Sequence, residues 1–251
     1  MPPSRASSRR LATVSAQLAA GSTAPRTQLT SHDRDPVRTG EGVRPPAGAL
    51  GAGMTDEQRF FFDLKGWIVL PEVLTRAECA EIMAEIDDPA GHNIWDSEKA
   101  LATIDHPAVT PILAELLSEP SFIGDESECY PFRCEGSFTT IRNPGWPVSE
   151  RGDNGLPHVV RPPQQANAMR YQCAGGKIFS GLTRVVWELE DVVAGQGNTG
   201  FLSGSHKAAF NYGGADPWAP NIGGSPWEQS MRAAMEDYSC PAGSVVIFTE
   251  S

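Results

Sequence analysis

Residues 240–251 read CPAGSVVIFTES, a sequence typical of a turn followed by a β-strand. A run of β-branched and aromatic residues after Pro-Ala-Gly predicts a turn followed by a strand over residues 244–249. Residues 185–189, VVWEL, predict a second central strand in which Val186 and Trp187 face opposite layers. Residues 199–203 are expected to lie beside that strand, after a turn over the sequence GQGN at residues 195–198.

The part of the chain before these strands is predicted to be mainly helical. Thr55, followed three residues later by Gln, forms a capping-box pattern and starts a helix over residues 55–65. A short strand over 67–70 ends at a proline, a second helix follows over 76–86, and a third covers 105–117. Helices followed by a run of short strands favour an α+β domain with a β-sandwich or barrel at its centre.

The charge of the chain limits its partners. The 251 residues include 31 acidic and 20 basic residues, and only three of the acids, Asp33, Asp35 and Glu41, precede residue 54. The acidic body argues against nucleic acid or an anionic membrane as the main partner. No apolar run is long enough to span a bilayer, so no membrane span is expected. The five cysteines are odd in number and lack zinc-site spacing, which indicates free thiols.

Residues 1–53 are rich in Ala, Gly, Pro, Ser, Thr and Arg and are expected to be disordered. Their acid-poor, Arg-rich start is typical of a transit peptide, which would direct the protein to a mitochondrion or plastid. Alternatively, they are a translated leader ahead of a true start at Met54, and the protein is cytoplasmic. In either case residues 54–251 are predicted to form the functional domain.

Three segments together resemble a known family. Residues 187–192 read WELEDV, residues 200–207 read GFLSGSHK, and residues 242–250 read AGSVVIFTE. These segments resemble the phytanoyl-CoA dioxygenase-like family of Fe(II)/2-oxoglutarate-dependent oxygenases. The resemblance implies a double-stranded β-helix (a cupin-like jelly roll) with flanking N-terminal helices. It also implies Fe(II), 2-oxoglutarate as co-substrate, and hydroxylation of a small or lipid-like molecule.

Non-haem Fe(II) oxygenases bind the metal with two histidines and one carboxylate. The resemblance implies that His158 is the first histidine ligand, whereas His206 shapes a turn after a strand. Position 160, where the family's carboxylate is expected, holds Val. Three explanations remain open: Asp153 supplies the carboxylate, the position stays open as in related halogenases, or the protein has no working iron site.

Two further interpretations concern the strand at residues 185–189. In the family manner Trp187 would line the co-substrate pocket, although an indole of this size is more often part of the core. Glu188, Glu190 and Asp191 form an acidic run, which is interpreted as a solvated strand end. Arg170 and Arg184 are the basic residues nearest the predicted centre, but their spacing assigns them no role.

The resemblance also places a second iron-binding histidine, and an arginine that binds 2-oxoglutarate, beyond residues 243–248. Because the sequence ends at Ser251, the last core strands are expected to be missing and the chain to be a fragment. The leading hypothesis is therefore a dioxygenase that is incomplete in this form. The alternative is a non-catalytic β-sandwich that retained the fold without the metal. Neither the substrate nor the oligomeric state follows from the sequence.

Overall fold

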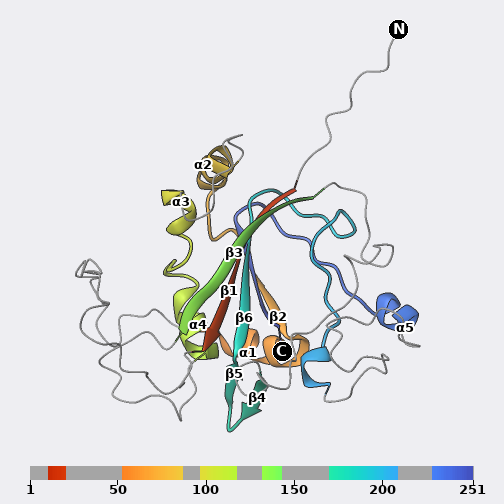
Figure 1. Ribbon diagram of the computed structural model, residues 1–251. Coiled ribbons are helices and arrows are strands. Elements are labelled where there is room, and N and C mark those ends of the chain that lie inside the picture. The colour runs from red at the N-terminus through yellow and green to blue at the C-terminus, as the bar shows by residue number, and fades with distance from the viewer. Residues whose placement is uncertain are drawn as a thin grey trace, which may run out of the picture.

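The computed structural model describes residues 11–20, 53–86, 97–117, 132–142, 170–208 and 228–250. Within these ranges the chain has a mixed helix and strand structure in which neighbouring strands pair antiparallel. Five strands form one sheet in the order β2-β7-β6-β1-β3, and β4 and β5 form a separate hairpin (Figure 1).

The elements agree with most of the predicted ones. The sheet strands, in spatial order, are β2 (Trp67–Leu70), β7 (Ser244–Thr249), β6 (Leu182–Glu188), β1 (Leu11–Ala20) and β3 (Phe132–Arg142). The hairpin consists of β4 (Tyr171–Ala174) and β5 (Lys177–Ser180). The helices are α1 (Asp56–Lys65), α2 (Arg76–Ile86), α3 (Glu98–Leu101), α4 (Thr110–Leu117), α5 (Glu228–Ala233) and the 3-10 turn η5 (Ser205–Lys207).

The capping box predicted for the first helix is confirmed. The Thr55 hydroxyl accepts a hydrogen bond from the Gln58 amide at 3.1 Å, and the Gln58 side chain accepts one from the Thr55 amide at 2.8 Å. The third predicted helix, α4, begins later than expected, at Thr110, whose amide donates a hydrogen bond to the His106 carbonyl at 2.9 Å. Across the described residues, no helix is both long and apolar enough to cross a membrane.

β1 lies inside the segment that was expected to be disordered. It is hydrogen-bonded to β6 on one side and to β3 on the other. Its sequence, LATVSAQLAA, contains no proline, glycine or charged residue. An extended backbone is therefore possible throughout, and the neighbouring strands satisfy its amide and carbonyl groups. Disorder does not describe these ten residues, and the boundary between leader and domain stays a prediction.

The predicted neighbour of β6 is wrong. Residues 199–203 do not join the sheet, and the strands beside β6 are β7 and β1. Phe201 instead forms an isolated antiparallel bridge with Glu236. Gly195 and Gly197 have left-handed φ angles of 80° and 98°. These angles turn the chain away from β6 before it can form a hairpin with that strand.

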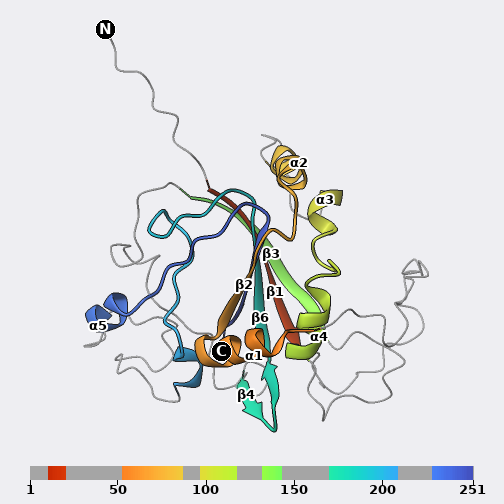
Figure 2. The same ribbon diagram turned by 180° about the vertical axis from the view of Figure 1, so that it is seen from behind.

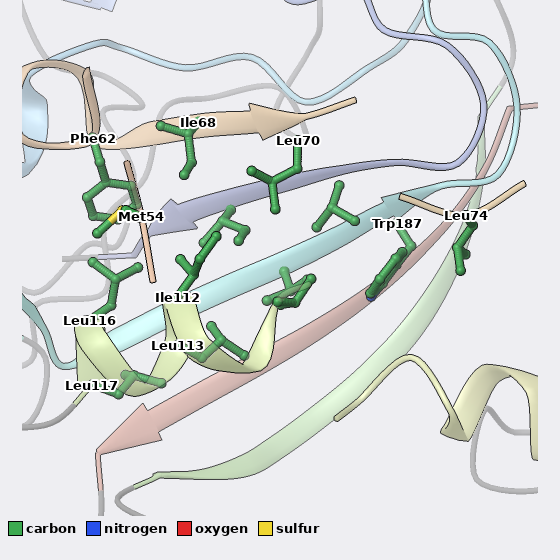
Figure 3. Packing of buried hydrophobic residues seen from close by; sticks show 14 of the residues in the cluster. Met54, Phe62, Ile68, Leu70, Leu74, Ile112, Leu113, Leu116, Leu117 and Trp187 are labelled. Carbon is green, nitrogen blue, oxygen red and sulfur yellow. The ribbon is translucent and has the colours of Figure 1, made fainter. Parts of the chain in front are cut away.

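The main hydrophobic core lies between one face of the sheet and the helices. We call this side of the sheet the first face. Leu113, Leu116 and Leu117 of α4 pack there together with Phe62 of α1 and Ile247 of β7 (Figure 3). In both overall views α2, α3 and α4 lie on one side of the sheet, whereas residues 189–204 and 234–243 lie on the other (Figures 1 and 2). Helices therefore cover the first face, whereas mostly non-helical segments cover the other face.

Trp187 belongs to this core. Its side chain is 1 % exposed and lies on the first face among the helix residues (Figure 3). The His106 ring meets the indole edge to face at a centroid distance of 5.3 Å. The His106 Nδ1 atom accepts a hydrogen bond from the Ala108 amide at 3.2 Å, which places the proton of the neutral ring on Nε2. Trp187 thus packs as a core residue, one of the two readings that its sequence left open.

The turn before β7 is fixed by close contact with the segment after β2. The Leu74 amide donates a hydrogen bond to the Gly243 carbonyl at 3.0 Å. Gly243 has a φ angle of 85°, and a Cβ atom at this position would lie 1.9 Å from the Leu74 carbonyl oxygen. Only glycine satisfies both the backbone angle and the approach, so the predicted Pro-Ala-Gly turn has a specific steric cause.

The substitution Gly243→Ala is expected to lower the free energy of unfolding by at least about 3 kcal/mol, because it combines a left-handed φ with a backbone collision. Gly176→Ala is the matched control, since Gly176 has a φ of 77° but no heavy atom within 4 Å of the added Cβ. That control should cost about 1 kcal/mol. Urea unfolding followed by circular dichroism measures both values, and equal costs would contradict the steric explanation.

His106 should make stability depend on pH. Burial lowers the pKa of His106 from its usual 6.5, although Glu78 and Asp105 act in the opposite direction. Because the pKa of His106 is lower in the folded state than in the unfolded state, neutral His106 stabilises the fold fully above about pH 6.5. This contribution to the unfolding free energy is lost as the pH falls. The difference in unfolding free energy between the wild type and His106→Gln should therefore shrink between pH 8 and pH 5. A difference that stays constant over this range would rule out this linkage.

Candidate functional site

β6 alternates its side chains between the two faces of the sheet. Val185 and Trp187 lie in the helix-side core, whereas Val186 packs in a separate cluster with Val246. We call the side opposite the first face the second face, and its residues on β6 and β7 include Arg184, Val186, Glu188, Val246 and Phe248. This second face carries the charged groups of the central strands and is the candidate site.

Part of the second face is closed by stacked aromatic rings. Trp67 of β2 stacks on Phe201 at a centroid distance of 4.9 Å, and Phe201 meets the Phe248 ring at 5.0 Å and the Tyr238 ring at 5.9 Å. The Trp67 Nε1 group donates a hydrogen bond to the Ser203 hydroxyl at 3.0 Å. Residues outside the sheet thus cover its β2 and β7 side with an apolar layer.

Glu188 is buried, contrary to the interpretation of residues 188–191 as a solvated strand end. Its side chain is 3 % exposed, and its carboxylate accepts a short hydrogen bond from the Tyr238 hydroxyl. Asp191, in contrast, is about half exposed and pairs with Arg76 at 2.6 Å. The acidic run is therefore divided, because strand alternation turns Glu188 inward while the chain leaves the sheet before Asp191.

Arg184 and Glu250 form an ion pair on the second face. The Arg184 Nε and Glu250 Oε1 atoms are 2.5 Å apart, and the side chains are 18 % and 5 % exposed. The Glu250 amide donates a hydrogen bond to the Leu182 carbonyl at 3.0 Å, which fixes the backbone beyond β7 against β6. Sequence spacing assigned Arg184 no role and did not single out Glu250, because their proximity depends on the pairing of β6 with β7.

Two aromatic rings flank the Arg184 guanidinium. Its central carbon lies 5.2 Å from the Phe138 ring centroid and 5.9 Å from the Phe248 ring centroid. At these distances a guanidinium is attracted to the ring electrons. Phe138 is 46 % exposed, so the group of residues reaches solvent beside β3. The Arg184 guanidinium therefore lies within contact distance of two aromatic rings, one of which is partly exposed.

His206 has a structural position, as the resemblance implied. Its ring is buried, Nε2 donates to the Asp63 carbonyl at 3.0 Å, and the ring edge meets Tyr171 at a centroid distance of 4.4 Å. Gly66, which ends α1 with a φ of 87°, allows this contact: a Cβ there would lie 2.6 Å from His206 Nδ1. The turn at residues 204–207 is therefore held tightly on the end of α1.

A polar cluster surrounds this turn. The Tyr171 hydroxyl donates to Asp63 Oδ1 at 2.7 Å, and Lys207 Nζ lies 3.0 Å from Asp63 Oδ2. Partial burial acts to raise the pKa of Asp63, but the bonds from Tyr171 and Lys207 outweigh it and lower the pKa. The cluster joins α1, the β4–β5 hairpin and the turn, and it supports the end of the sheet rather than the second face.

The predicted metal ligands are not among these groups. His158 and Asp153, together with Val160, lie outside the described residues. Within the described part of the chain, no group of three or more His, Cys, Asp or Glu side chains is arranged to hold a metal ion. The assignment of His158 and Asp153 as ligands stays a prediction.

The Arg184–Glu250 pair should contribute strongly to stability. Glu250→Gln removes the carboxylate charge that pairs with a largely buried guanidinium, and a loss of about 2–4 kcal/mol in unfolding free energy is expected. Glu236→Gln is the control, because its partner Lys65 lies 3.2 Å away in a pair that is about one-third to one-half exposed. That substitution should cost about 0–1 kcal/mol. Chemical denaturation measures both, and similar losses would contradict a special role for the buried pair.

Comparison with known proteins gives limited similarity. No protein-family model matches the chain, and no curated protein matches it. Similar solved structures include HygX from Streptomyces hygroscopicus with nickel and 2-oxoglutarate bound, with a TM-score of 0.46 and 16 % identity over 79 % of this chain and 78 % of that one. The iron-bound form has a TM-score of 0.46 at 15 % identity over the same shares, 79 % and 78 %. At this level of similarity, the function of the chain has to be inferred from its own residues.

Proposed function

We propose that the chain is an Fe(II)- and 2-oxoglutarate-dependent dioxygenase that hydroxylates a small or lipid-like substrate. The supporting observation is that the three family-like segments are neighbours in the fold. Residues 242–250 contain β7, which pairs directly with β6, the strand that leads into residues 187–192. Residues 200–207 contact residues 242–250 through Phe201, whose ring centroid lies 5.0 Å from that of Phe248. The resemblance therefore involves one connected part of the molecule.

In this proposal the five-stranded sheet is one of the two sheets of a double-stranded β-helix, and its second face looks into the barrel. The first face is already covered by helices, which agrees with a sheet whose other face encloses a site. Ligand sites are mostly apolar with a few placed polar groups, and the second face has this composition.

Iron would be held by His158 and by a carboxylate, for which Asp153 on the same stretch of sequence is the candidate. When bound, the metal supplies the redox chemistry of the reaction. The contribution of the chain's own residues is to orient both organic molecules and to exclude water. The aromatic rings of Trp67, Phe201 and Phe248 are suited to the second task because they form an apolar layer beside the charged pair.

One observation favours a different function. Position 160 holds Val where the family's carboxylate is expected, and a lone histidine binds a divalent metal weakly. On this alternative the chain is a β-sandwich that binds a small molecule without metal. The two functions differ in one measurable property, namely affinity for a divalent ion.

Anaerobic titration with Co(II), followed by its visible absorption bands, tests the proposal. The full chain should bind one equivalent, and His158→Ala should weaken binding by at least about tenfold because a ligand is removed. Asp153→Asn should weaken it in the same direction. Subsequent addition of 2-oxoglutarate should change the spectrum of the bound ion.

His32→Ala is the control, since this histidine lies in the predicted leader and should leave the affinity unchanged. If His158→Ala binds Co(II) as tightly as the wild type, the ligand assignment is wrong. If the wild-type chain shows no ligand-field spectrum, the metal-free binding protein is the better description.

A further inference from the structure

A loop on the side of the sheet away from the helices is closed by two isolated β-bridges (Figures 1 and 2). Val192 pairs with Cys240, and Phe201 pairs with Glu236. Each bridge has a pair of backbone hydrogen bonds, 2.8 and 3.0 Å long in the first and 2.9 and 2.7 Å long in the second. Residues 193–200 therefore lie opposite the shorter segment that joins Glu236 to Cys240, and the longer segment has to bulge.

Side chains of the shorter segment bind amides of the bulging segment, which we call the 193–200 loop. The Ala194 amide donates a hydrogen bond to the Ser239 hydroxyl at 2.9 Å. The Gly195 amide donates one to Asp237 Oδ2 at 3.1 Å. One oxygen of the Asp237 carboxylate is thus fixed against the loop, and Oδ1 is its second oxygen.

Asn198 of the loop is held with its amide oxygen as the remaining polar atom. The residue is 3 % exposed, and its Nδ2 group donates to the Thr199 and Tyr238 carbonyls, both at 3.2 Å. The amide cannot be turned over, because its oxygen would then face two carbonyl oxygens. Since Tyr238 adjoins Asp237, both side chains lie where the 193–200 loop crosses the shorter segment, a place that we call the loop crossing.

Within the described part of the chain, two side-chain oxygens at the loop crossing have no hydrogen-bond partner. They are Asn198 Oδ1 and Asp237 Oδ1, and both atoms are buried. An amide oxygen and an ionised carboxylate oxygen can only accept hydrogen bonds, so neither can satisfy the other. A buried acceptor without a partner is destabilising. A cation satisfies both oxygens at once and balances the charge of Asp237.

We propose that the loop crossing binds a hard cation, for which Ca²⁺ is the best match, through Asp237 Oδ1 and Asn198 Oδ1. Ca²⁺ takes about 6–8 oxygen ligands in a flexible geometry, among them carboxylates, amide oxygens, backbone carbonyls and waters. Mg²⁺ demands a near-ideal octahedron, and transition metals prefer nitrogen or sulfur ligands to amide oxygens. A single carboxylate predicts weak binding, with a dissociation constant of about 0.1–1 mM.

The bound ion would hold the 193–200 loop in place. This loop leads into Phe201, whose ring contacts Trp67 and Phe248 on the second face. The ion would therefore support the apolar layer from outside the sheet. It uses none of the predicted iron ligands, so this inference does not depend on the proposed function.

Calcium binding is measured on the full chain, after dialysis against EDTA and without added iron. Calorimetry should show one equivalent of Ca²⁺ bound, with Mg²⁺ at least about tenfold weaker. Urea unfolding at about 10 mM CaCl₂ should show a higher midpoint than in EDTA, because a ligand of the folded state stabilises that state. Tb³⁺, which also takes oxygen ligands, should show luminescence excited through Tyr238, which adjoins Asp237, and through Trp67, whose ring lies 6.3 Å from that of Tyr238.

Asp237→Asn tests the carboxylate. The asparagine keeps an oxygen for the Gly195 amide but removes the charge, so the Ca²⁺ affinity should fall at least about tenfold and the Tb³⁺ luminescence should be lost. Glu236→Gln is the matched control, because it removes the same charge at the neighbouring residue, whose carboxylate pairs with Lys65 at 3.2 Å. It should change the Ca²⁺ affinity by less than about twofold.

No binding of Ca²⁺ to the wild type would overturn the inference and leave a water molecule as the better partner for the two oxygens. Equal losses of affinity in Asp237→Asn and Glu236→Gln would also overturn it, because the binding would then be a property of the acidic surface. Competition of Ca²⁺ with Co(II) for one equivalent would place both ions at the iron site and contradict a second one. The wild-type measurements decide the question even if Asp237→Asn does not fold. Absence of Co(II) binding with retained Ca²⁺ binding would refute the proposed enzyme and not the loop crossing.

Discussion

The ladder between β6 and β7 is the constraint on which the rest of the structure depends. Val245, Val246 and Ile247 are fully buried, so β7 is covered on both faces, and β6 beside it is almost as deeply enclosed. The side-chain period of a strand is two, so a shift of one residue would exchange the faces. A shift of β6 alone would turn Arg184 toward the helix-side core and away from Glu250. The register of one strand pair therefore determines both the core and the candidate site.

The two faces are stabilised by different kinds of interaction. The first face relies on burial of aliphatic and aromatic side chains from α1 and α4. The second face buries the Arg184–Glu250 pair and the Glu188–Tyr238 hydrogen bond among aromatic rings. Each of these charges has a partner, which avoids the large cost of an isolated buried ion.

Local features of the fold could be predicted from the sequence, whereas contacts between distant segments could not. The capping residue of α1 and the β-branched run of β7 are local signals, and both elements were found as predicted. Burial of Glu188 depends on Tyr238, which is 50 residues away, and no local pattern indicates it. Arg184 and Glu250 likewise meet only through the strand pairing. His158 and Asp153 rest on the family resemblance alone.

The position of β1 has a consequence for any precursor form of the protein. β1 separates β6 from β3, and β3 has no other strand partner within the described part of the chain. Proteolytic removal of residues 1–53 would take away β1 and leave unpaired edges on both of its neighbours. Cleavage beyond residue 20 is therefore incompatible with this sheet order. A chain cut at residue 53 would have to rebuild the sheet with another strand, whereas an uncut chain would keep residues 11–20 between β6 and β3.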